Sequence, residues 1–523
     1  MNELQLKRFN RVEDLEKKNV ILLGASQKYL AEITAEGIAL ENIQAIIALY
    51  PPKRNTMIYN SEKIIPVFYI QDFLEIISKD NRNDIFTCEY MIADGYYREY
   101  YDVIKDNEAF LKCSDHVWWF PNAATKEELA YREKYDVTGV KDIIIFRSGP
   151  QSTIYVEGMD FSDNARALFQ YMLDNGYNKK YELVWFVHDP AMFERYKNTE
   201  NVTFVGNTWA DNGTSAQKDE YYRVLCQAKY IFTTEAIAFA RNCRPDQIRV
   251  ELWHGSGIKD RTGNNSQARR YEYMTVVSDF YAGIFRKAYD LRPEQLLVTG
   301  YAKEDYLFEE PRKEILDELN IPKAKKYILW LPTFRHGGDK SSAYATLDRM
   351  TETGLPVLDD MEKINTINDI CKEHDIQIII KLHPIQDRTR IADINVSNIV
   401  IVETTELARK DIQINQMMPL TDALISDYSS AAIDYMHLDR PISFLVDDRK
   451  EFAENRRFLF NPIEEWLPGV IINTCDEFKD FIVDVSNGID TSKDKRHQRF
   501  SEIHSFNDGN SRKRILEAVG VDL

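Results

Sequence analysis

The chain consists of short apolar segments that alternate with helical patterns, and this alternation limits the folds that it can adopt. Residues 423–434 illustrate one repeat, in which an apolar segment runs through Asp427 and two adjacent serines into a helical pattern. Apolar segments of about four to eight residues that alternate with helices are typical of a parallel β-sheet covered on both faces. Such sheets bind ligands at the carboxyl ends of their strands. The pattern therefore predicts an α/β fold with its functional residues in the loops after the strands.

The length of 523 residues exceeds what one hydrophobic core supports, and at roughly 150 residues per domain it suggests about three domains. The alternation starts near residue 19, is interrupted by a polar helical stretch at 124–134, and resumes at residue 142. A helical pattern at 511–519 is placed to cross back from the last domain. We therefore expect an additional Rossmann-like α/β domain over residues 1–125, a second Rossmann-like domain over 126–300, and a third over 301–523.

The first of these domains carries only a weak nucleotide-binding signal. Its first apolar segment ends at Gly24, but no Gly-x-Gly-x-x-Gly fingerprint follows. A structural turn therefore explains this glycine better than a dinucleotide site does. A role in binding, a role in assembly and the loss of any role are all left open for this domain.

The composition excludes some partners. The 84 acidic side chains outnumber the 66 lysines and arginines, which gives a formal net charge of −18. Nucleic-acid binding depends on clustered Lys and Arg, so we expect no nucleic-acid partner. The cysteines are far apart and form no Cys-x-x-Cys pair, which favours reduced thiols and gives no metal-site spacing. They are Cys88, Cys113, Cys226, Cys243, Cys371 and Cys475.

The start of the sequence is polar, and no apolar run approaches the ~20 residues of a membrane-spanning helix. We therefore expect a cytoplasmic protein. No long basic amphipathic helix argues for membrane binding, although peripheral association at the inner face of the cell membrane is compatible with the sequence.

Two histidines follow apolar segments and are candidates for acid–base chemistry. His254 directly follows the segment 250–253 and precedes Gly255, and a glycine permits a ligand to approach the backbone closely. His383 follows the segment 378–382, which contains Lys381, and precedes a proline. Taken alone, His383 is more often a residue that fixes a loop, and the two interpretations of His254 are balanced.

Other loops carry groups that suit a phosphate. Ser429 and Ser430 stand where a helix begins, so their hydroxyls and the unpaired N–H groups of the helix can converge on an anion. Plain helix capping explains the same serines. Thr333 and Arg335 lie together in another polar loop. Arg335 is also explained as a solvated loop charge, Asp427 as a cap of the serine loop, and Asp434 as a partner of the helix dipole.

Considered jointly, these groups suit transfer from a diphosphate-activated donor. A hydroxyl acceptor needs a base that titrates near neutrality, which histidine provides. The leaving phosphate and the transferred phosphoryl group need positive or dipolar partners, which an arginine, a histidine and a helix end provide. No Asp-x-Asp motif or carboxylate cluster offers a metal cage, so we expect no metal and no cofactor other than the substrate donor.

Several ordered motifs between residues 140 and 523 resemble the CDP-glycerol glycerophosphotransferase family, which includes teichoic-acid primases and polymerases and related capsule polymerases. Together they make the resemblance far more specific than any single motif. The matching segments are 252–255 (Leu-Trp-His-Gly) with Lys259 downstream, 299–305 (Thr-Gly-Tyr-Ala-Lys-Glu-Asp), 331–335 (Leu-Pro-Thr-Phe-Arg), 381–384 (Lys-Leu-His-Pro), 425–435 (Ile-Ser-Asp-Tyr-Ser-Ser-Ala-Ala-Ile-Asp-Tyr), 438–442 with Asp447 and Asp448, and 506–514.

The resemblance implies a GT-B fold, in which an acceptor-side and a CDP-donor-binding Rossmann-like domain face a cleft. It implies transfer of glycerol phosphate or ribitol phosphate from a CDP-activated donor to a hydroxyl of a teichoic-acid-like or capsular polymer or its lipid-linked primer, with release of CMP. His254 resembles the family's proposed base, His383 its donor-phosphate histidine, and Ser429 and Ser430 its diphosphate-binding pair. Arg335 and Thr333 resemble further phosphate contacts, and the remaining donor-site positions are Gly255, Lys381, Asp427 and Asp434.

Two departures leave the acceptor and the donor polyol open. The family commonly has Thr-Pro after His-Gly, where this chain has Ser256 and Gly257, and Pro-Arg-Asn after Thr-Gly-Tyr, where this chain has residues 302–304 (Ala-Lys-Glu). The first domain lies outside the resemblance. Two other functions are considered: a GT-B glycosyltransferase that uses a nucleotide-sugar, and a protein without activity that senses nucleotides or supports assembly.

Overall fold

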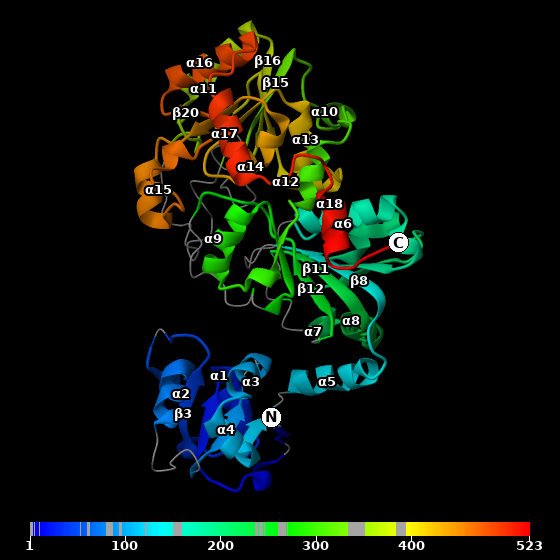
Figure 1. Ribbon diagram of the computed structural model, residues 1–523, viewed down its shortest axis with the longest axis vertical. Helices are drawn as coiled ribbons and strands as arrows, with labels where there is room; N and C mark the ends of the chain where they lie inside the picture. The colour runs from blue at the N-terminus through cyan, green and yellow to red at the C-terminus, as the bar shows by residue number, and fades with distance from the viewer. Residues whose placement is uncertain are drawn as a thin grey trace. The chain divides into compact units, whose positions relative to one another are not determined.

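The computed structural model describes the chain apart from residues 1–3, 5, 10, 53, 60–62, 80–86, 94–96, 121–122, 150–158, 236–238, 240–243, 245, 260–267, 269, 333–350 and 383–393. It divides into two compact units (Figure 1). The first consists of Met1–Thr138 and Ala210–Arg223, and the second of Gly139–Trp209 and Val224–Leu523.

The first unit is built on a seven-stranded sheet in the order β1-β7-β6-β2-β3-β5-β4. All neighbouring strands are parallel except β4 and β5, which are antiparallel. Adjacent residues of β2 belong to different apolar clusters, Leu22 to one and Leu23 to the other, so both faces of the sheet are covered. The strands are β1 (Lys7–Arg8), β2 (Val20–Leu23), β3 (Ile43–Ala48), β4 (Thr56–Tyr59), β5 (Lys63–Tyr69), β6 (Glu89–Ile92) and β7 (Val117–Trp119).

Helices connect these strands. The predicted polar helix appears as α5, and its Tyr131 stacks on Tyr222 of α8 with ring centroids 5.2 Å apart. The helices of this unit are α1 (Gln27–Ala35), α2 (Ile70–Ser78), α3 (Tyr97–Ile104), α4 (Glu108–Lys112), α5 (Ala123–Asp136) and most of α8 (Ser215–Gln227), while the short α7 (Trp209–Asn212) begins at the boundary.

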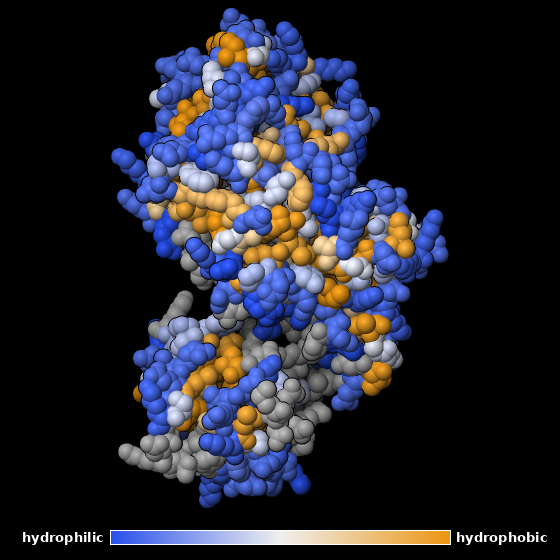
Figure 2. Space-filling model, in the orientation of Figure 1, coloured by the Kyte–Doolittle hydropathy of each residue, from blue (hydrophilic) through white to orange (hydrophobic). Residues whose placement is uncertain are grey.

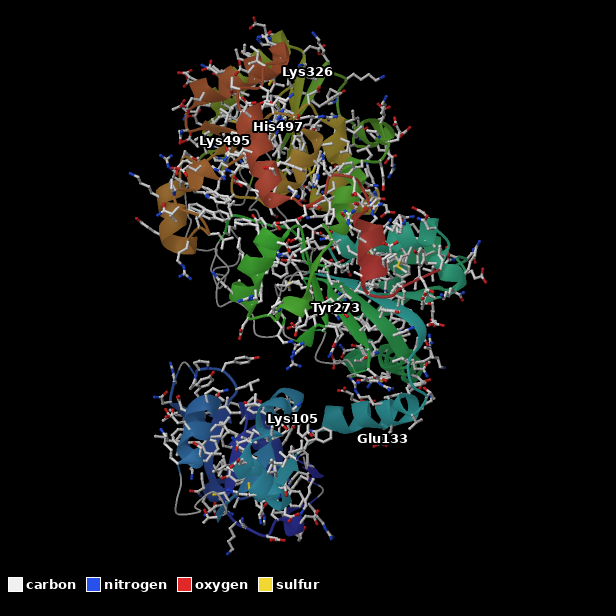
Figure 3. The ribbon with its side chains drawn as sticks, in the orientation of Figure 1. Lys105, Glu133, Tyr273, Lys326, Lys495 and His497 are labelled. Carbon is white, nitrogen blue, oxygen red and sulfur yellow. The ribbon has the colours of Figure 1, made fainter. Side chains whose placement is uncertain are left out.

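The second unit contains two parallel sheets, which Figure 3 marks through Tyr273 on β13 and Lys326 on β15. The first has seven strands in the order β10-β9-β8-β11-β12-β13-β14, with the helices α6 (Asp163–Asp174) and α9 (Asp279–Tyr289). Its strands are β8 (Lys141–Ser148), β9 (Glu182–Val187), β10 (Val202–Gly206), β11 (Ala228–Thr234), β12 (Ile248–Glu251), β13 (Tyr273–Val276) and β14 (Leu296–Val298).

The second sheet of this unit has six parallel strands in the order β17-β16-β15-β18-β19-β20. The strands are β15 (Lys326–Trp330), β16 (Ile376–Lys381), β17 (Ile399–Val402), β18 (Ala423–Ser426), β19 (Ile442–Leu445) and β20 (Val470–Ile472). The helices are α10 (Glu314–Glu318), α11 (Met361–Glu373), α12 (Thr404–Arg409), α13 (Ile414–Met417), α14 (Ala431–Tyr435), α15 (Arg449–Arg456), α16 (Cys475–Asn487) and α17 (Lys493–Ile503).

The last helix, α18 (Ser511–Ala518), returns to the first sheet of the second unit, where Figure 1 shows it beside α6. Its Ile515 and Leu516 are buried in the same apolar cluster as residues of β8, β9 and α6. The main-chain N–H groups of Ser511 and Arg512 donate to the two carboxylate oxygens of Asp305, at 2.9 and 2.8 Å. The C-terminus is thereby fixed to the segment that joins the two sheets.

The predicted α/β class with parallel sheets is confirmed. The division into two compact units does not separate the two sheets of residues 139–523. The predicted domain boundaries at residues 125 and 300 therefore stay a prediction. The surface in Figure 2 is largely hydrophilic, in line with the net charge of −18. None of the helices that the structure describes combines the length and the apolar character needed to cross a lipid bilayer.

Candidate functional site

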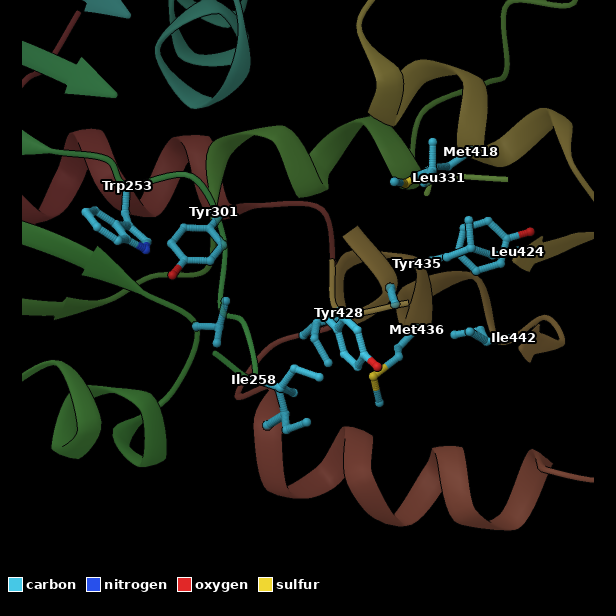
Figure 4. Close-up of a cluster of buried hydrophobic side chains, with 14 of the residues drawn as sticks. Trp253, Ile258, Tyr301, Leu331, Met418, Leu424, Tyr428, Tyr435, Met436 and Ile442 are labelled. Atoms are coloured by element: carbon cyan, nitrogen blue, oxygen red, sulfur yellow. The ribbon is translucent and has the colours of Figure 1, made fainter. Parts of the chain in front are cut away.

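One apolar cluster joins the two sheets of the second unit. Figure 4 shows Trp253 and Tyr301, which come from the loops of the first sheet, near Tyr428 from the second. The same cluster contains Leu424 of β18 and Val276 of β13, both fully buried. The loops after β12 and β18 therefore pack on a shared core, and this core positions the site.

The loop after β12 carries His254 and has an unusual backbone. Trp253 has a left-handed φ of +55° and Gly255 a φ of +143°. A β-carbon at Gly255 would lie 2.7 Å from Oγ and 3.0 Å from Cβ of Ser430, closer than side chains approach one another. Only glycine therefore permits this contact between the loop after β12, in the first half (the sheet β8–β14), and the start of α14, in the second half (the sheet β15–β20). The structure thus brings together three of the predicted site residues, His254, Gly255 and Ser430.

Glu235, which the sequence analysis did not identify, contacts the imidazole of His254. Its Oε1 lies 3.0 Å from Nδ1 of His254, and the two side chains are one third and about one seventh exposed. This contact engages Nδ1, so Nε2 is the nitrogen that can exchange a proton with a substrate. Glu235 follows β11, whose carboxyl end lies beside that of β12 in the sheet. Glu235 could have been predicted from its position alone, because it follows a strand whose carboxyl end lies at the same sheet edge as His254.

Beneath this pair lies a second carboxyl group, Glu251, which is fully buried at the end of β12. Its Oε1 accepts hydrogen bonds from the main-chain N–H groups of Glu235, at 2.9 Å, and Trp253, at 3.1 Å. Both of these residues have left-handed φ angles, which L-residues rarely adopt and which cost about 1 kcal/mol or more each. Burial raises the pKa of Glu251 to about 8, although these bonds and that from Thr233 oppose the shift. Glu251 therefore holds both loops in their strained conformation.

A buried ammonium group connects the histidine loop to α14. Nζ of Lys303 donates to the carbonyl oxygen of His254 at 2.6 Å and lies 3.3 Å from Oδ2 of Asp434 and 3.5 Å from Oδ1 of Asp163. Burial opposes the positive charge, but Asp163 and Asp434 outweigh it and raise the pKa of Lys303 above its usual value. Burial raises the pKa of Asp434 to about 6 in spite of Lys303. The predicted site residue Asp434 thus fixes the position of the His254 backbone.

The two serines lie at the start of α14, which has five residues. Oγ of Ser429 accepts a hydrogen bond of 3.3 Å from the N–H of Ala431, as a capping residue does. The side chain of Ser430 makes no such bond and lies against Gly255 instead. Asp427 is buried, and its Oδ1 accepts from the N–H of Tyr428 at 2.6 Å. Ser429 and Asp427 therefore order their own loop, whereas Ser430 faces the histidine loop.

Lys381 ends β16, which is separated from β18 by the single strand β15. Burial lowers the pKa of its ammonium group to about 8, and none of the residues that the structure describes forms an ion pair with it. Lys381 is half-buried, and a partly desolvated cation without a carboxylate partner among the described residues is suited to an anionic ligand. Three other predicted site residues, Thr333, Arg335 and His383, lie outside the described residues.

A small cavity of about 50 Å³ lies between the two halves at the histidine loop. Side chains of His254 and Lys259 line it from one half, and Tyr428, Ser430 and Leu459 from the other. Residues of α9 close it with apolar groups. The cavity therefore joins the candidate base to the candidate phosphate-binding loop.

One group of described residues has the composition of a metal site. Glu304, His437 and His504 each place one potential ligand atom within 4.8 Å of the others. Oε1 of Glu304 and Nε2 of His437 are buried and have no hydrogen-bond partner among the described residues. Burial also lowers the pKa of His504 to about 4, which keeps this imidazole neutral. These side chains could hold a divalent ion, but Nε2 of His437 lies 3.8 Å from Oε2 of Glu304, so an ion pair explains them equally well.

Comparisons with known proteins identify the family of the chain and its relatives. The sequence model of the family described as CDP-glycerol:poly(glycerophosphate) glycerophosphotransferase matches residues 142–520. The teichoic acid ribitol-phosphate polymerase TarK of Staphylococcus aureus is 26% identical over 314 residues, which are 56% of each chain. A teichoic acid poly(glycerol phosphate) polymerase of Bacillus spizizenii is 25% identical over 409 residues, which are 72% of this chain and 91% of that protein.

The chain thus spans about half the length of some curated relatives, such as TarK and TarL of Staphylococcus aureus, and most of the length of others. Among solved structures, that of the wall teichoic acid polymerase TagF aligns with a TM-score of 0.55 and 22% identity, covering 76% of this chain and 93% of that one. This likeness supports the same fold.

Proposed function

Because the chain belongs to the CDP-glycerol:poly(glycerophosphate) glycerophosphotransferase family, we propose that it transfers a polyol phosphate from a CDP-activated donor. The donor is CDP-glycerol or CDP-ribitol, and the acceptor is a hydroxyl of a teichoic-acid-like or capsular polymer or of its lipid-linked primer. The names of the relatives, polymerases of glycerol phosphate and of ribitol phosphate, support both donors. The observation that carries the proposal is the pair of His254 and Glu235 placed beside Ser430.

The reaction is a direct displacement at phosphorus. The acceptor oxygen attacks the phosphorus that carries the polyol and forms a new P–O bond, while the bond from this phosphorus to the bridging oxygen breaks and CMP leaves. The proton of the acceptor hydroxyl passes to Nε2 of His254, which acts as the general base. The carboxylate of Glu235 stabilises the imidazolium that forms, since it lies 3.0 Å from Nδ1.

We assign the donor diphosphate to the loops of the second sheet. The side chain of Ser430 lies against Gly255 and lines the cavity, within reach of a phosphate bound there. Lys381 supplies positive charge at the same sheet edge, and a bound phosphate would raise its pKa again. We retain His383, Arg335 and Thr333 as phosphate contacts on the basis of the sequence.

We propose that the displacement needs no metal ion. The sequence offers no carboxylate cage beside His254, and cationic side chains together with hydrogen-bond donors can neutralise the charge that develops on the leaving group. Glu304 directly follows Lys303 and groups with His437 and His504, and the reaction as written does not use this group.

We further propose that the two parallel sheets of residues 139–523 form a GT-B fold with an active cleft between them, and that residues 1–125 form an additional Rossmann-like domain. The return of α18 to the first sheet supports the GT-B assignment. We expect the protein to act in the cytoplasm, with peripheral association at the inner face of the cell membrane if its acceptor is linked to a lipid.

The test is an assay of nucleotide release. Purified protein is incubated with CDP-glycerol, CDP-ribitol and a set of UDP-sugars, with and without a polyol-phosphate acceptor, and the released nucleotides are separated by chromatography. Release of CMP from a CDP-polyol supports the proposal. Release of UDP from a UDP-sugar would establish the glycosyltransferase alternative, and binding of nucleotides without any turnover would favour a sensing protein.

A further inference from the structure

The first unit contains a large cavity that the transfer reaction does not use. Its volume is about 680 Å³, within the range of roughly 300–1,000 Å³ that small-molecule sites occupy. It lies at the carboxyl ends of the neighbouring strands β2 and β3, where it is lined by Gly24, Ala48 and Leu49. The strand order reverses between β2 and β6, and the cavity lies beside this reversal, on the side of β3, with Tyr100 of α3 among its lining residues. Open α/β sheets bind ligands at such a reversal.

Hydrogen bonds hold the walls of this cavity in place. The hydroxyl of Tyr100 donates to the carbonyl oxygen of Ile47 at 3.0 Å and accepts from the N–H of Leu49 at 2.9 Å, which fixes the chain after β3. Nε2 of Gln27 donates to the carbonyl oxygen of Ile58 at 2.6 Å, which joins the start of α1 to β4. The cavity is therefore formed before a ligand arrives, which reduces the entropy lost on binding.

The lining has a distinct chemistry. The chain has 84 acidic side chains, yet none of the fourteen described residues that line the cavity is acidic, and Arg54 is the one with a charged side chain among them. Arg54 is exposed and forms no ion pair with any residue that the structure describes. The other walls are mainly apolar, and Tyr50 presents a ring that is 43% exposed. This combination is complementary to a ligand that has a flat, largely apolar ring and a negative charge.

We propose that this cavity binds a nucleoside phosphate, with its base against Tyr50 and the apolar walls and its phosphate at Arg54. A dinucleotide site of the Rossmann type places an acidic residue after the second strand, where it binds the ribose hydroxyls. In this chain Leu49 and Tyr50 follow β3 instead. The ribose-binding carboxylate of a dinucleotide site is therefore not present at these two positions, and we limit the proposal to a mononucleotide. The site lies in the first unit, and the proposed donor site lies in the second.

Hydrogen–deuterium exchange of the full-length protein tests this proposal without interference from the donor site. The probes are nucleoside 5′-mono- and diphosphates of all common bases, with inorganic phosphate as the reference anion. At least one nucleotide is expected to slow exchange in peptides that cover residues 20–30 and 45–58. Inorganic phosphate at the same concentration should slow it much less, because it cannot contact the apolar walls.

Two variants and one matched control locate the ligand. Arg54→Glu should weaken binding by about tenfold or more, since it replaces a charge-assisted contact by repulsion. Lys28→Glu makes the same change of charge on α1, where the side chain is 73% exposed and is not part of the lining, and it should bind as the parent protein does. Tyr50→Ala should weaken nucleotide binding but leave the weak effect of inorganic phosphate unchanged.

The possible results are decisive. Protection of both segments that disappears in Arg54→Glu and persists in Lys28→Glu supports the site. Equal protection by inorganic phosphate would reduce it to a general anion site and overturn the proposal, as would the absence of protection by any nucleotide up to about 5 mM, which corresponds to negligible affinity. Release of CMP from a CDP-polyol in the same preparations reports on the second unit, so failure here leaves the proposed transfer reaction intact.

Discussion

Replacing Glu235 by glutamine tests the proposed base in the most direct way. The substitution keeps the size of the side chain and an oxygen that can stay close to Nδ1 of His254. It removes only the negative charge that would face the imidazolium in the transition state. Because the charge on histidine develops during proton transfer, the loss should appear in kcat and not in the affinity for the donor.

The size of the effect follows from the geometry of the pair. A hydrogen bond to a charged group contributes about 1.5–3 kcal/mol, which is the upper limit for this pair because its 3.0 Å contact is not aligned as a hydrogen bond. Each 1.36 kcal/mol corresponds to about a tenfold change in rate. The contact of 3.0 Å is short, but Glu235 is one third exposed, so water can replace part of the lost stabilisation. We therefore expect kcat to fall by about 10- to 100-fold, toward the lower end of that range.

Single-turnover release of CMP measures this step, and donor affinity is measured separately by calorimetry. Glu194→Gln is the matched control, because its side chain is 70% exposed and it pairs only loosely with Lys197, at 3.5 Å. Glu235→Asp keeps the charge at a greater distance and should be intermediate. A variant Glu235→Gln with a kcat within about twofold of the parent, or with its whole loss in the Michaelis constant, would refute the role of the pair.

Four further substitutions test other parts of the site. His254→Ala should abolish transfer in the CMP assay and leave calorimetric binding of the CDP-polyol nearly unchanged; a parallel loss of donor affinity would speak against a base. Joint replacement of Ser429 and Ser430 by alanine should weaken donor binding by about tenfold, the equivalent of one or two hydrogen bonds, and unchanged affinity would exclude a phosphate contact. Gly255→Ala should lower the melting temperature by several degrees, because its new carbon would lie 2.7 Å from Oγ of Ser430; an unchanged melting curve would mean that the two halves do not close on each other. Glu251→Gln should remove a pH dependence: the unfolded chain ionises Glu251 above about pH 4.5 and the folded chain only near pH 8, so the parent protein should lose stability between these values and the variant should not. Equal slopes of melting temperature against pH in both proteins would contradict the buried neutral carboxyl.

Much of the fold is readable from the sequence because its local signals agree. Strands are predicted at residues 142–146 and 377–381, around the apolar runs 143–146 and 378–380, and the structure has β8 and β16 there. The helix at residues 511–519 is found as α18, Ser511–Ala518. Short strands with mixed composition are harder to predict, as β13 shows: it has four residues, and one of them is the buried polar Thr275. Such strands are stabilised by pairing with their neighbours in the sheet, which is a tertiary effect that local sequence does not show.

The site was predictable only in part. Motifs identify His254 and Ser430, and the sheet topology brings their loops to one place. No motif marks Glu235 or Glu251, since single carboxylates at strand ends are common and their roles depend on which strands are neighbours. Strand β12, which precedes His254, was expected to continue to Trp253. It ends at Glu251 instead, because Trp253 adopts a left-handed conformation.

Lys303 links the loop that carries the proposed base His254 to α14 of the second sheet. Its ammonium group binds the carbonyl oxygen of His254. Its two carboxylate partners come from different helices, Asp163 from α6 beside the first sheet and Asp434 from α14 beside the second. The burial of a cation between two carboxylates is favourable only while all three groups are in place, because removing one leaves an uncompensated charge. Any movement that separates the halves therefore breaks the same contacts that position His254. If His254 is the base, we therefore expect it to be held in position for proton transfer only when α14 is docked against its loop, which would couple this step to donor binding.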